Sequence, residues 1–422
     1  MAGWALFYFS MAKLLLVSRP MRCASPLPAA VLAGLFLTGC ATPKQDNAPH
    51  GTQFLGDNTQ VRRAQSPTGQ DLFPPQTALN VPAQSAALND SARFLAGMPA
   101  LGGRDAFSDL RATADWQQHH QKMEGAWAQF LARHGNPVNA WASTEISDLR
   151  SANSVFYPFS GPDFLFAHTF FPKADTYLLC GLEPCEPLPV WNTLSPDDVG
   201  RGLNGLQTSL STILQFSYFI TKDMRQDLQA TRFRGVLPVF MVFLARTGHV
   251  VDSVDAVRLD GNGNLVVFAA GQSTVPGLMI RAHGPHGAKR LIYFSQDLSD
   301  GGMSGGFQRF ASSLGRPAVL LKSASYLMHE GSFSRIRNQV LTHTCGIVQD
   351  PSGVPLRFLQ QQGFKISYYG NYTNALSIFK QYEQPELAVA YANPANHAKP
   401  LGFSMGYLTG ASSTAVIVAR PK

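Results

Sequence analysis

The chain has 422 residues, of which 45% are hydrophobic and 14% are charged, the composition of a globular protein rather than a disordered one. Lys and Arg number 34 and Asp and Glu number 27, so the formal net charge is +7. The basic residues are scattered, and no run of Lys and Arg of the length expected for a polyanion site occurs. Composition and charge therefore predict no nucleic-acid partner.

The N-terminal region has the pattern expected of an export signal. Arg22 precedes an apolar run at residues 27–37 that is too short for a membrane span of roughly 20 residues, and the run ends in Leu37-Thr38-Gly39-Cys40. This segment resembles the lipobox of bacterial lipoproteins. The resemblance implies that residues 1–40 are a lipoprotein signal peptide and that Cys40 becomes the lipid-modified first residue of the mature chain. The implied partner is then the membrane, which the protein binds through the lipid on Cys40.

The same resemblance implies a location. Ala41 and Thr42 follow Cys40, and no Asp stands there as an inner-membrane retention signal. We therefore expect the protein to lie in the bacterial cell envelope, anchored by lipid to the outer membrane and facing the periplasm. A plain secretory signal with a chance cysteine and an N-terminal membrane anchor over residues 4–37 are the alternatives. Translation could begin at Met1, Met11 or Met21.

Cleavage would change both the charge and the cysteine count. Loss of Lys13, Arg19 and Arg22 leaves 31 basic and 27 acidic residues, a net charge of about +4. Besides Cys40, the mature chain would keep Cys180, Cys185 and Cys345. Disulfides persist in exported proteins, so the close pair Cys180 and Cys185 is a candidate bridge.

Residues 41–100 are predicted to be a flexible linker, because Gln, Asn, Ser, Thr and Pro are frequent from residue 41 to about residue 90.

Residues 101–153 are predicted to be a helical segment. Apolar residues recur at helical spacing over 105–133, and Gly135-Asn136-Pro137 is expected to end that helix before a second one at 138–150.

Residues 154–422 are predicted to be an α/β domain: a largely parallel, Rossmann-like sheet with helices on both faces. The Asp260-Gly261-Asn262-Gly263-Asn264 segment predicts a hairpin, because Gly and Asn tolerate positive φ. Helices are expected at 163–171, 206–220 and around Phe310 and Ile336. Strands are expected at 154–159, 176–182, 236–244, 250–259, 265–269, 277–281, 290–294, 318–322, 365–369, 402–407 and 415–419.

The first candidate site lies where the first strand turns into a helix. Ser160, Gly161 and Asp163 follow the strand, and Glu183 follows the next strand. In an open parallel sheet, ligands bind beyond the carboxyl ends of the strands. Ser160, Asp163 and Glu183 are therefore candidate catalytic residues and Gly161 a candidate cofactor-binding residue. The alternative is that Ser160, Gly161 and Asp163 only form the turn and cap the helix.

This strand–turn–helix–strand–Glu order, ending in a late hairpin of strands, resembles the nucleoside-binding sheet of methyltransferases over about residues 154–420. The family's glycine-rich loop is absent, because Gly161 stands alone where two or three glycines are expected. An exported protein also meets little S-adenosylmethionine. The resemblance therefore implies the fold without the activity, and we expect no cofactor.

Two glycine motifs fit their sequence contexts poorly. Gly200-Arg201-Gly202-Leu203-Asn204-Gly205 matches G-x-G-x-x-G, but no strand precedes it, so helix packing is the favoured explanation. Gly302-Met303-Ser304-Gly305-Gly306 matches the G-x-S-x-G of serine hydrolases, with Asp297, Asp300 and His329 as available partners. A polar loop precedes Ser304, which is better placed to cap the following helix.

A second polar strand end carries Lys322, Ser325, Tyr326 and His329, of which Tyr326 and His329 complete the set of candidate catalytic residues. Asp350 and Ser352 follow a third strand and are interpreted as turn residues. His283 and His286 have no evident third ligand, so no metal site is predicted.

Several segments also resemble a group of bacterial exported proteins with no assigned activity, which adds nothing on chemistry. They are residues 156–166, 179–184, 322–329, 347–355 and 369–372. The sequence thus predicts a lipid-anchored protein whose α/β domain binds a small molecule or an envelope protein. The alternative is a hydrolase or transferase that uses the strand-end residues.

Overall fold

The computed structural model describes residues 83–218, 228, 230–267, 276–408 and 414–422. The chain divides into two units, Met1–Gln70 and Asp71–Lys422, and all described residues belong to the second. The predicted signal peptide, Cys40 and the linker up to residue 82 lie outside the described residues.

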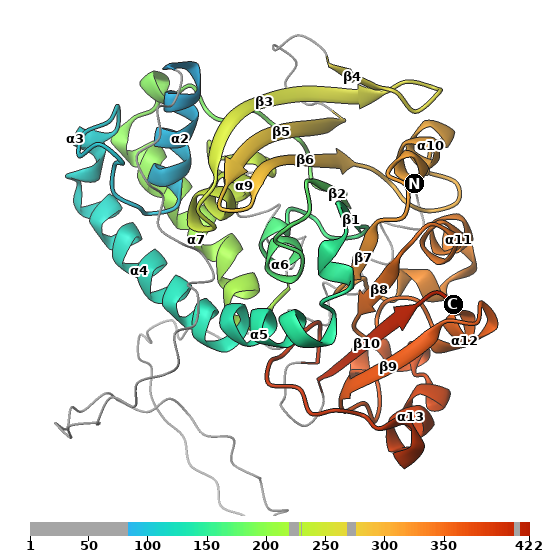
Figure 1. Ribbon diagram of the computed structural model, residues 1–422. Coiled ribbons are helices and arrows are strands. Elements are labelled where there is room, and N and C mark those ends of the chain that lie inside the picture. Colours follow the sequence, from blue (N-terminus) through green and yellow to red (C-terminus); the bar gives the residue numbers. More distant parts are fainter. Residues whose placement is uncertain (1–82, 219–227, 229, 268–275, 409–413) are drawn as a thin grey trace, which may run out of the picture. The chain divides into compact units, whose positions relative to one another are not determined.

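A mixed sheet of ten strands forms the centre of this unit, in the order β4-β3-β5-β6-β2-β1-β7-β8-β10-β9 (Figure 1). The strands are β1 (Ser154–Tyr157), β2 (Thr176–Gly181), β3 (Val250–Leu259), β4 (Leu265–Val267), β5 (Gly277–Gly284), β6 (Gly287–Ser295), β7 (Ala318–Leu321), β8 (Gly346–Gln349), β9 (Lys365–Gly370) and β10 (Ala415–Arg420).

The predicted largely parallel sheet is confirmed only at its centre. The strands β6-β2-β1-β7-β8 pair in parallel, whereas the other five of the nine pairings are antiparallel. At one edge the strands are antiparallel because short hairpin turns join β3 to β4 and β5 to β6. The β3–β4 hairpin forms as predicted, with the Asp260 carboxylate accepting from the amides of Asn262 and Asn264 at 2.8 Å. A second tight turn joins β5 to β6.

Helices surround the sheet. The α-helices are α2 (Ala83–Leu95), α3 (Ser108–Arg111), α4 (Ala114–Phe130), α5 (Asn136–Glu145), α6 (Phe164–Phe170), α7 (Pro196–Phe216), α9 (Leu237–Arg246), α10 (Gly305–Ser313), α11 (Ser334–Thr342), α12 (Leu356–Gln361) and α13 (Pro385–Ala392). A π-helical turn covers Leu131–Gly135, and short 3-10 turns cover Leu149–Ser151, Trp191–Thr193, Leu327–His329, Gly331–Phe333, Ser377–Tyr382 and Pro394–Asn396.

Neighbouring residues of β6 show that helices cover both faces of the sheet. Successive side chains of a strand point to opposite faces. The ring of Tyr293 contacts Phe240 of α9 at 5.5 Å between centroids, whereas Phe294 contacts Phe307 and Phe310 of α10 at 6.1 and 5.8 Å. The predicted two-sided α/β arrangement is therefore present here.

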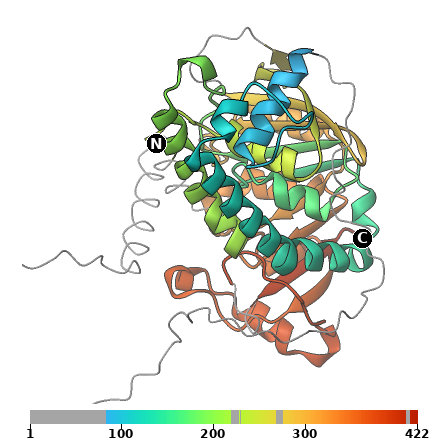
Figure 2. The same ribbon diagram turned by 90° about the vertical axis from the view of Figure 1, so that its left-hand side faces the viewer.

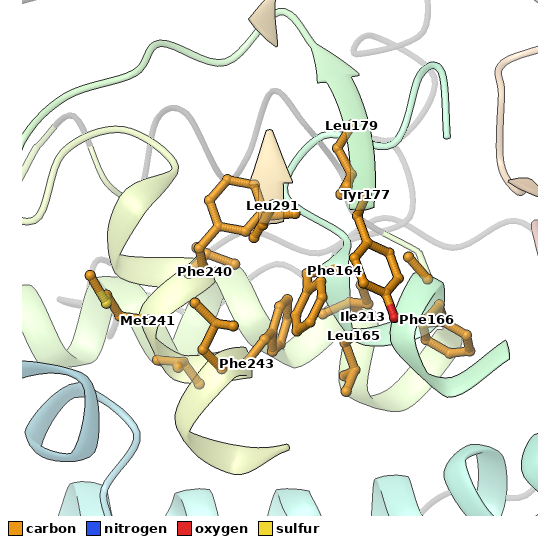
Figure 3. Packing of buried hydrophobic residues seen from close by; sticks show 14 of the residues in the cluster. Phe164, Leu165, Phe166, Tyr177, Leu179, Ile213, Phe240, Met241, Phe243 and Leu291 are labelled. Atoms are coloured by element: carbon orange, nitrogen blue, oxygen red, sulfur yellow. The ribbon is translucent and has the colours of Figure 1, made fainter. Parts of the chain in front are cut away.

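The largest apolar cluster lies on the α6 and α9 face, where Phe164 and Phe240 approach the β-sheet residues Tyr177 and Leu291 (Figure 3). Helices α4 and α7 lie side by side next to this layer (Figure 2). All ten residues of α9 are buried. Burial on every side explains why residues 236–244 were predicted as a strand and form a helix instead, since a uniformly apolar run has no helical period.

Three other expectations need correction. Gly135 and Pro137 do not end the helix, because the π-helical turn leads directly into α5. Pro137 stands in the first turn of α5, where a helix tolerates a residue without a backbone N–H group. The predicted strand at 402–407 is instead a turn closed by a bridge between Met405 and Leu408.

The predicted linker at 41–100 also overlaps folded structure. Asn89 of α2 bonds both the amide and the carbonyl of Val251 in β3, at 2.8 and 2.9 Å, and Ser85 bonds the same carbonyl at 2.7 Å. The folded part therefore begins before residue 100. Helices occupy most of the predicted helical segment, from Ser108 to Ser151.

Candidate functional site

A buried ion pair lies between the carboxyl ends of β1 and β7. Asp163 caps α6 by accepting from the Phe166 amide at 3.0 Å, and its other oxygen receives Tyr157 Oη at 3.0 Å and Lys322 Nζ at 2.9 Å. The side chains of Asp163 and Lys322 are 1% and 2% exposed. Lys322 also donates to the carbonyl of Ser217 and lies 4.3 Å from the ring of Phe166. The single cation is therefore fully engaged.

A second carboxylate follows β8. Asp350 accepts from the amides of Ser323 and Ser352 at 3.0 Å and from the Ser352 hydroxyl. Asp350 and Ser352 are each 1% exposed. The partners come from β7 and β8, so this network ties the two strand ends together. We call Tyr157, Asp163, Lys322 and Asp350 the strand-end cluster.

Burial dominates the electrostatics of this cluster. It raises the pKa of Asp163, while Lys322 and the Phe166 amide oppose that rise. It also raises the pKa of Asp350 against the hydrogen bonds from Ser352 and Ser323 and the charge of Lys322. The pKa of Tyr157 lies well above its ordinary value, first through burial and then through Asp163. Two acidic groups thus share one lysine in a desolvated space.

Left-handed backbone concentrates around the same strand ends. Within the described ranges, six residues other than glycine have positive φ: Phe159, Ser217, Ser323, Ser325, Tyr326 and His397. Phe159 follows β1, three follow β7, and Ser217 ends α7 next to Lys322. Such conformations cost of order 1–3 kcal/mol each and persist where the surroundings impose them, often at functional sites.

Two hydroxyl groups beside Lys322 lack hydrogen-bond partners. Ser217 is 0% exposed, and neither its Oγ nor the buried Oγ of Ser323 has a partner among the described residues. Buried polar groups are nearly always satisfied, so each exception needs an explanation. Other such atoms in the described part belong to His, Trp and Arg side chains, and the two serine hydroxyls are both next to the same lysine.

The sequence-predicted residues Ser160, Gly161 and Glu183 form a separate group at the ends of β1 and β2. Ser160 Oγ bonds the backbone of Cys180 and Gly161, and the Glu183 carboxylate receives Tyr293 Oη at 2.9 Å. A Cβ on Gly161 would lie 2.9 Å from Glu183 Oε1. Gly161, with φ of +54°, therefore makes room for a protein carboxylate, and Ser160 serves the turn.

Tyr326 and His329 form a third group. Their rings lie 5.1 Å apart, and Tyr382 stacks on Tyr326 at 5.5 Å. Burial lowers the pKa of His329 to about 4 and leaves its imidazole neutral at pH 7. The five predicted catalytic candidates are thus distributed over three buried groups with separate partners.

The other motifs have structural roles. The G-x-G-x-x-G glycines lie inside α7, which starts earlier because Ser195 and Asp198 form a capping box. Ser304 is the N-cap of α10 and accepts from the Phe307 amide at 3.1 Å, as favoured from the sequence. Asp300 caps α11 through the amides of Ser334 and Arg335. Asp300 and Ser304 are therefore both engaged in helix caps.

The structure describes the candidate cysteine pair and both histidines of the His283 and His286 pair. Cys180 and Cys185 are free thiols, so the candidate bridge is not formed. His283 bonds Asp252 at 2.7 Å. In the part of the chain that the structure describes, no group of three or more His, Cys, Asp or Glu side chains is arranged to hold a metal ion. No described helix is long and apolar enough to cross a membrane.

Comparison with protein-family models, with curated proteins and with solved structures gave no match. The candidate site therefore depends on the geometry of this chain alone. Sequence reasoning found Asp163 but left out Tyr157, Ser217, Lys322 and Asp350 as site residues. The sequence signal that could have identified Lys322 and Asp350 is their position, since each is a charged residue directly after an apolar strand, β7 or β8.

Proposed function

We propose that the chain is a bacterial lipoprotein, anchored by lipid at Cys40 to the outer membrane and facing the periplasm, whose α/β domain binds a small molecule. The lipobox-like Leu37-Thr38-Gly39-Cys40 segment supports the anchor. Residues 41–82 supply a connection of polar composition between that anchor and α2.

The binding site that we propose is the strand-end cluster. Numbered along the chain, the five parallel strands have the spatial order 3-2-1-4-5, since β6 comes third and β7 fourth. This is the order of a Rossmann-like sheet, and such sheets bind ligands at the carboxyl ends where the order reverses, between β1 and β7 here. Beyond β8, strand β10 pairs antiparallel with both β8 and β9, which supports the methyltransferase-type element order.

One observation carries this proposal. Five of the six left-handed residues other than glycine in the described ranges surround Lys322 and the ends of β1 and β7. A fold that only needed stability would not concentrate strain beside a buried ion pair and two orphaned hydroxyls.

The charges favour a particular ligand class. Lys322 is already bonded to Asp163 and to a carbonyl, so among the described residues of the cluster its charge is already compensated and an anionic ligand is disfavoured. Asp163 and Asp350 supply acceptor oxygens, and Ser217 and Ser323 supply hydroxyls. We propose a small, uncharged or cationic compound that carries hydroxyl or amino groups.

Binding is better supported than catalysis or a protein partner. Ser160 and Glu183 belong to one group and His329 to another, so the candidate serine and histidine do not meet at one point. The large exposed apolar residues of the described part are Val190, Phe216, Val267, Leu376 and Val389, which come from five different segments. No helix or strand presents a row of them for an envelope protein.

The anchor is tested with Cys40→Ser, compared with Cys345→Ser as a matched cysteine control. We expect the Cys40→Ser protein to leave the membrane fraction and to lose the mass of the acyl chains at its N-terminus, while Cys345→Ser behaves as wild type. A mature N-terminus that is unmodified and lies before Cys40 would refute the lipoprotein assignment.

The site is tested with Ser217→Ala and Ser323→Ala, because these hydroxyls have no hydrogen-bond partner among the described residues and we expect both variants to fold. Native mass spectrometry of protein purified from cell envelopes should show a small co-purifying compound, retained less by both variants. Ser304→Ala, which removes a helix cap elsewhere, is the control and should retain the compound. Equal retention in all four proteins would refute the assigned site.

A further inference from the structure

One short turn of the C-terminal region packs against Asp350 and the segment after β7 in the strand-end cluster. Residues Met405, Gly406, Tyr407 and Leu408 form this turn, closed by the bridge between Met405 and Leu408. We call it the 405–408 turn. It is held at its base by Phe403, whose ring contacts Trp141 at 5.6 Å and Phe170 at 6.3 Å.

Gly406 sets how closely the turn approaches the site. Its φ is +78°, and a Cβ built on it would lie only 1.7 Å from Oδ2 of Asp350. No other residue could occupy this position with the turn as it stands. The backbone of the turn therefore packs directly onto a carboxylate of the strand-end cluster.

Tyr407 connects the turn to the left-handed segment after β7. Its hydroxyl donates to the Ser323 carbonyl at 2.8 Å and receives the Ser325 hydroxyl at 3.0 Å. Its ring contacts Phe379 at 4.9 Å and Tyr218 at 5.4 Å. Both bonded serines have positive φ, so the tyrosine hydroxyl holds the strained backbone in place.

We infer that the 405–408 turn is the gate of the strand-end site, closed in this structure and released when Tyr407 leaves Ser323 and Ser325. This inference rests on the proposed binding function. A gate is needed because Asp163, Lys322 and Asp350 are each at most 3% exposed, so a ligand reaches them only if a covering element moves. Besides the bonds of the Tyr407 hydroxyl, the turn accepts a hydrogen bond from Thr414 Oγ1 at the Leu408 carbonyl, at 2.6 Å, and Phe403 packs at its base.

The test measures opening without any ligand. Ser323→Cys places a thiol under the gate, and its labelling by N-ethylmaleimide, followed by peptide mass spectrometry, reports how often the gate opens. Tyr407→Phe in that background removes the hydroxyl bonds and keeps the ring. We expect labelling of the thiol at position 323 to become roughly tenfold faster, which corresponds to about 1.4 kcal/mol.

The matched control is Tyr391→Phe, because Tyr391 Oη also bonds two carbonyls, those of Tyr369 and Val416, away from the site. It should leave labelling at position 323 unchanged. Equal labelling with and without the Tyr407 hydroxyl, or equal acceleration by Tyr391→Phe, would overturn the gate. A gate that opens as expected in a protein that retains no small compound would refute the binding function instead.

Discussion

Asp163 and Lys322 form the interaction on which the strand-end site depends. Replacing one partner of a buried pair leaves an uncompensated charge, which costs about 3–5 kcal/mol. We expect Asp163→Asn to lower the free energy of unfolding by that amount, measured by chemical denaturation, because Lys322 keeps its charge without its carboxylate partner.

Tyr157→Phe removes one hydrogen bond to Asp163 and should lower the free energy of unfolding by about 1 kcal/mol in the same measurement.

Lys322→Met should behave differently from Asp163→Asn, because Asp163 can take up a proton when its partner is gone. Its pKa is already raised by burial. The destabilisation by Lys322→Met should therefore be smaller at pH 5 than at pH 8. A loss that is independent of pH would mean that Asp163 stays ionised without the lysine.

Buried histidines predict that the protein loses stability in mild acid. Burial lowers the pKa of His119 to about 4, of His249 to about 3 and of His329 to about 4, from an ordinary 6.5. The unfolded chain then binds more protons below pH 6.5, so stability falls as the pH drops from 6.5 toward 4. Each histidine should cost about 2 kcal/mol between pH 7.5 and pH 5. The raised pKa values of Asp163 and Asp350 act in the opposite direction.

His119→Gln isolates one of these groups. The ring of His119 lies between the Leu95 carbonyl and the Gln207 amide, and a glutamine can replace part of this bonding without titrating. The slope of unfolding free energy against pH, measured by urea denaturation between pH 7.5 and 5, should decrease by about 0.8 kcal/mol per pH unit, which corresponds to about 0.6 proton. An unchanged slope would contradict the assignment.

Sequence patterns identified some of these residues and missed others for a physical reason. Asp163 was recognisable because it follows a strand and a Gly-Pro turn at a helix start. Lys322 and Asp350 depend on partners that come from distant strands or loops. No local period encodes such a pairing, so only the assembled sheet reveals that these side chains meet.

At the scale of elements, the left-handed segment after β7 makes a specific prediction. Ser323→Gly removes a side chain whose Oγ has no partner and allows φ of +54° without strain. We expect this change to raise the unfolding free energy by up to about 1 kcal/mol while it weakens retention of the bound compound.

His397→Gly is the matched control, because His397 is exposed and has φ of +46° far along the chain from β7. It should give a similar stabilisation with no effect on the compound. If Ser323→Gly stabilised the protein and left retention unchanged, the strain after β7 would have no connection with binding.

Element boundaries were predictable where turn chemistry marked them. The Asp260–Asn264 hairpin and the Ser304 cap both follow from local hydrogen bonds and were anticipated. Helix α9 and the π-helical turn before α5 were not, because burial on all sides hides the helical period and tertiary packing carries the helix past Gly135.

At the scale of the whole chain, we propose a lipid-anchored N-terminus followed by a domain with a buried polar site. The sequence predicted helices on both faces of an α/β sheet but overestimated its parallel part. Short hairpins at one edge and the β10 insertion at the other make the outer strands antiparallel. The parallel centre alone contains the reversal of strand order that places the site.

The most direct measurement of the central claim is native mass spectrometry of the wild-type protein released from cell envelopes without denaturant. We predict an added mass of a small, uncharged or cationic compound with hydroxyl or amino groups. This mass should disappear on denaturation and be reduced in Ser217→Ala and Ser323→Ala. A protein that carries only its lipid, with identical spectra for the wild type and both variants, would contradict a binding site at the ends of β1, β7 and β8.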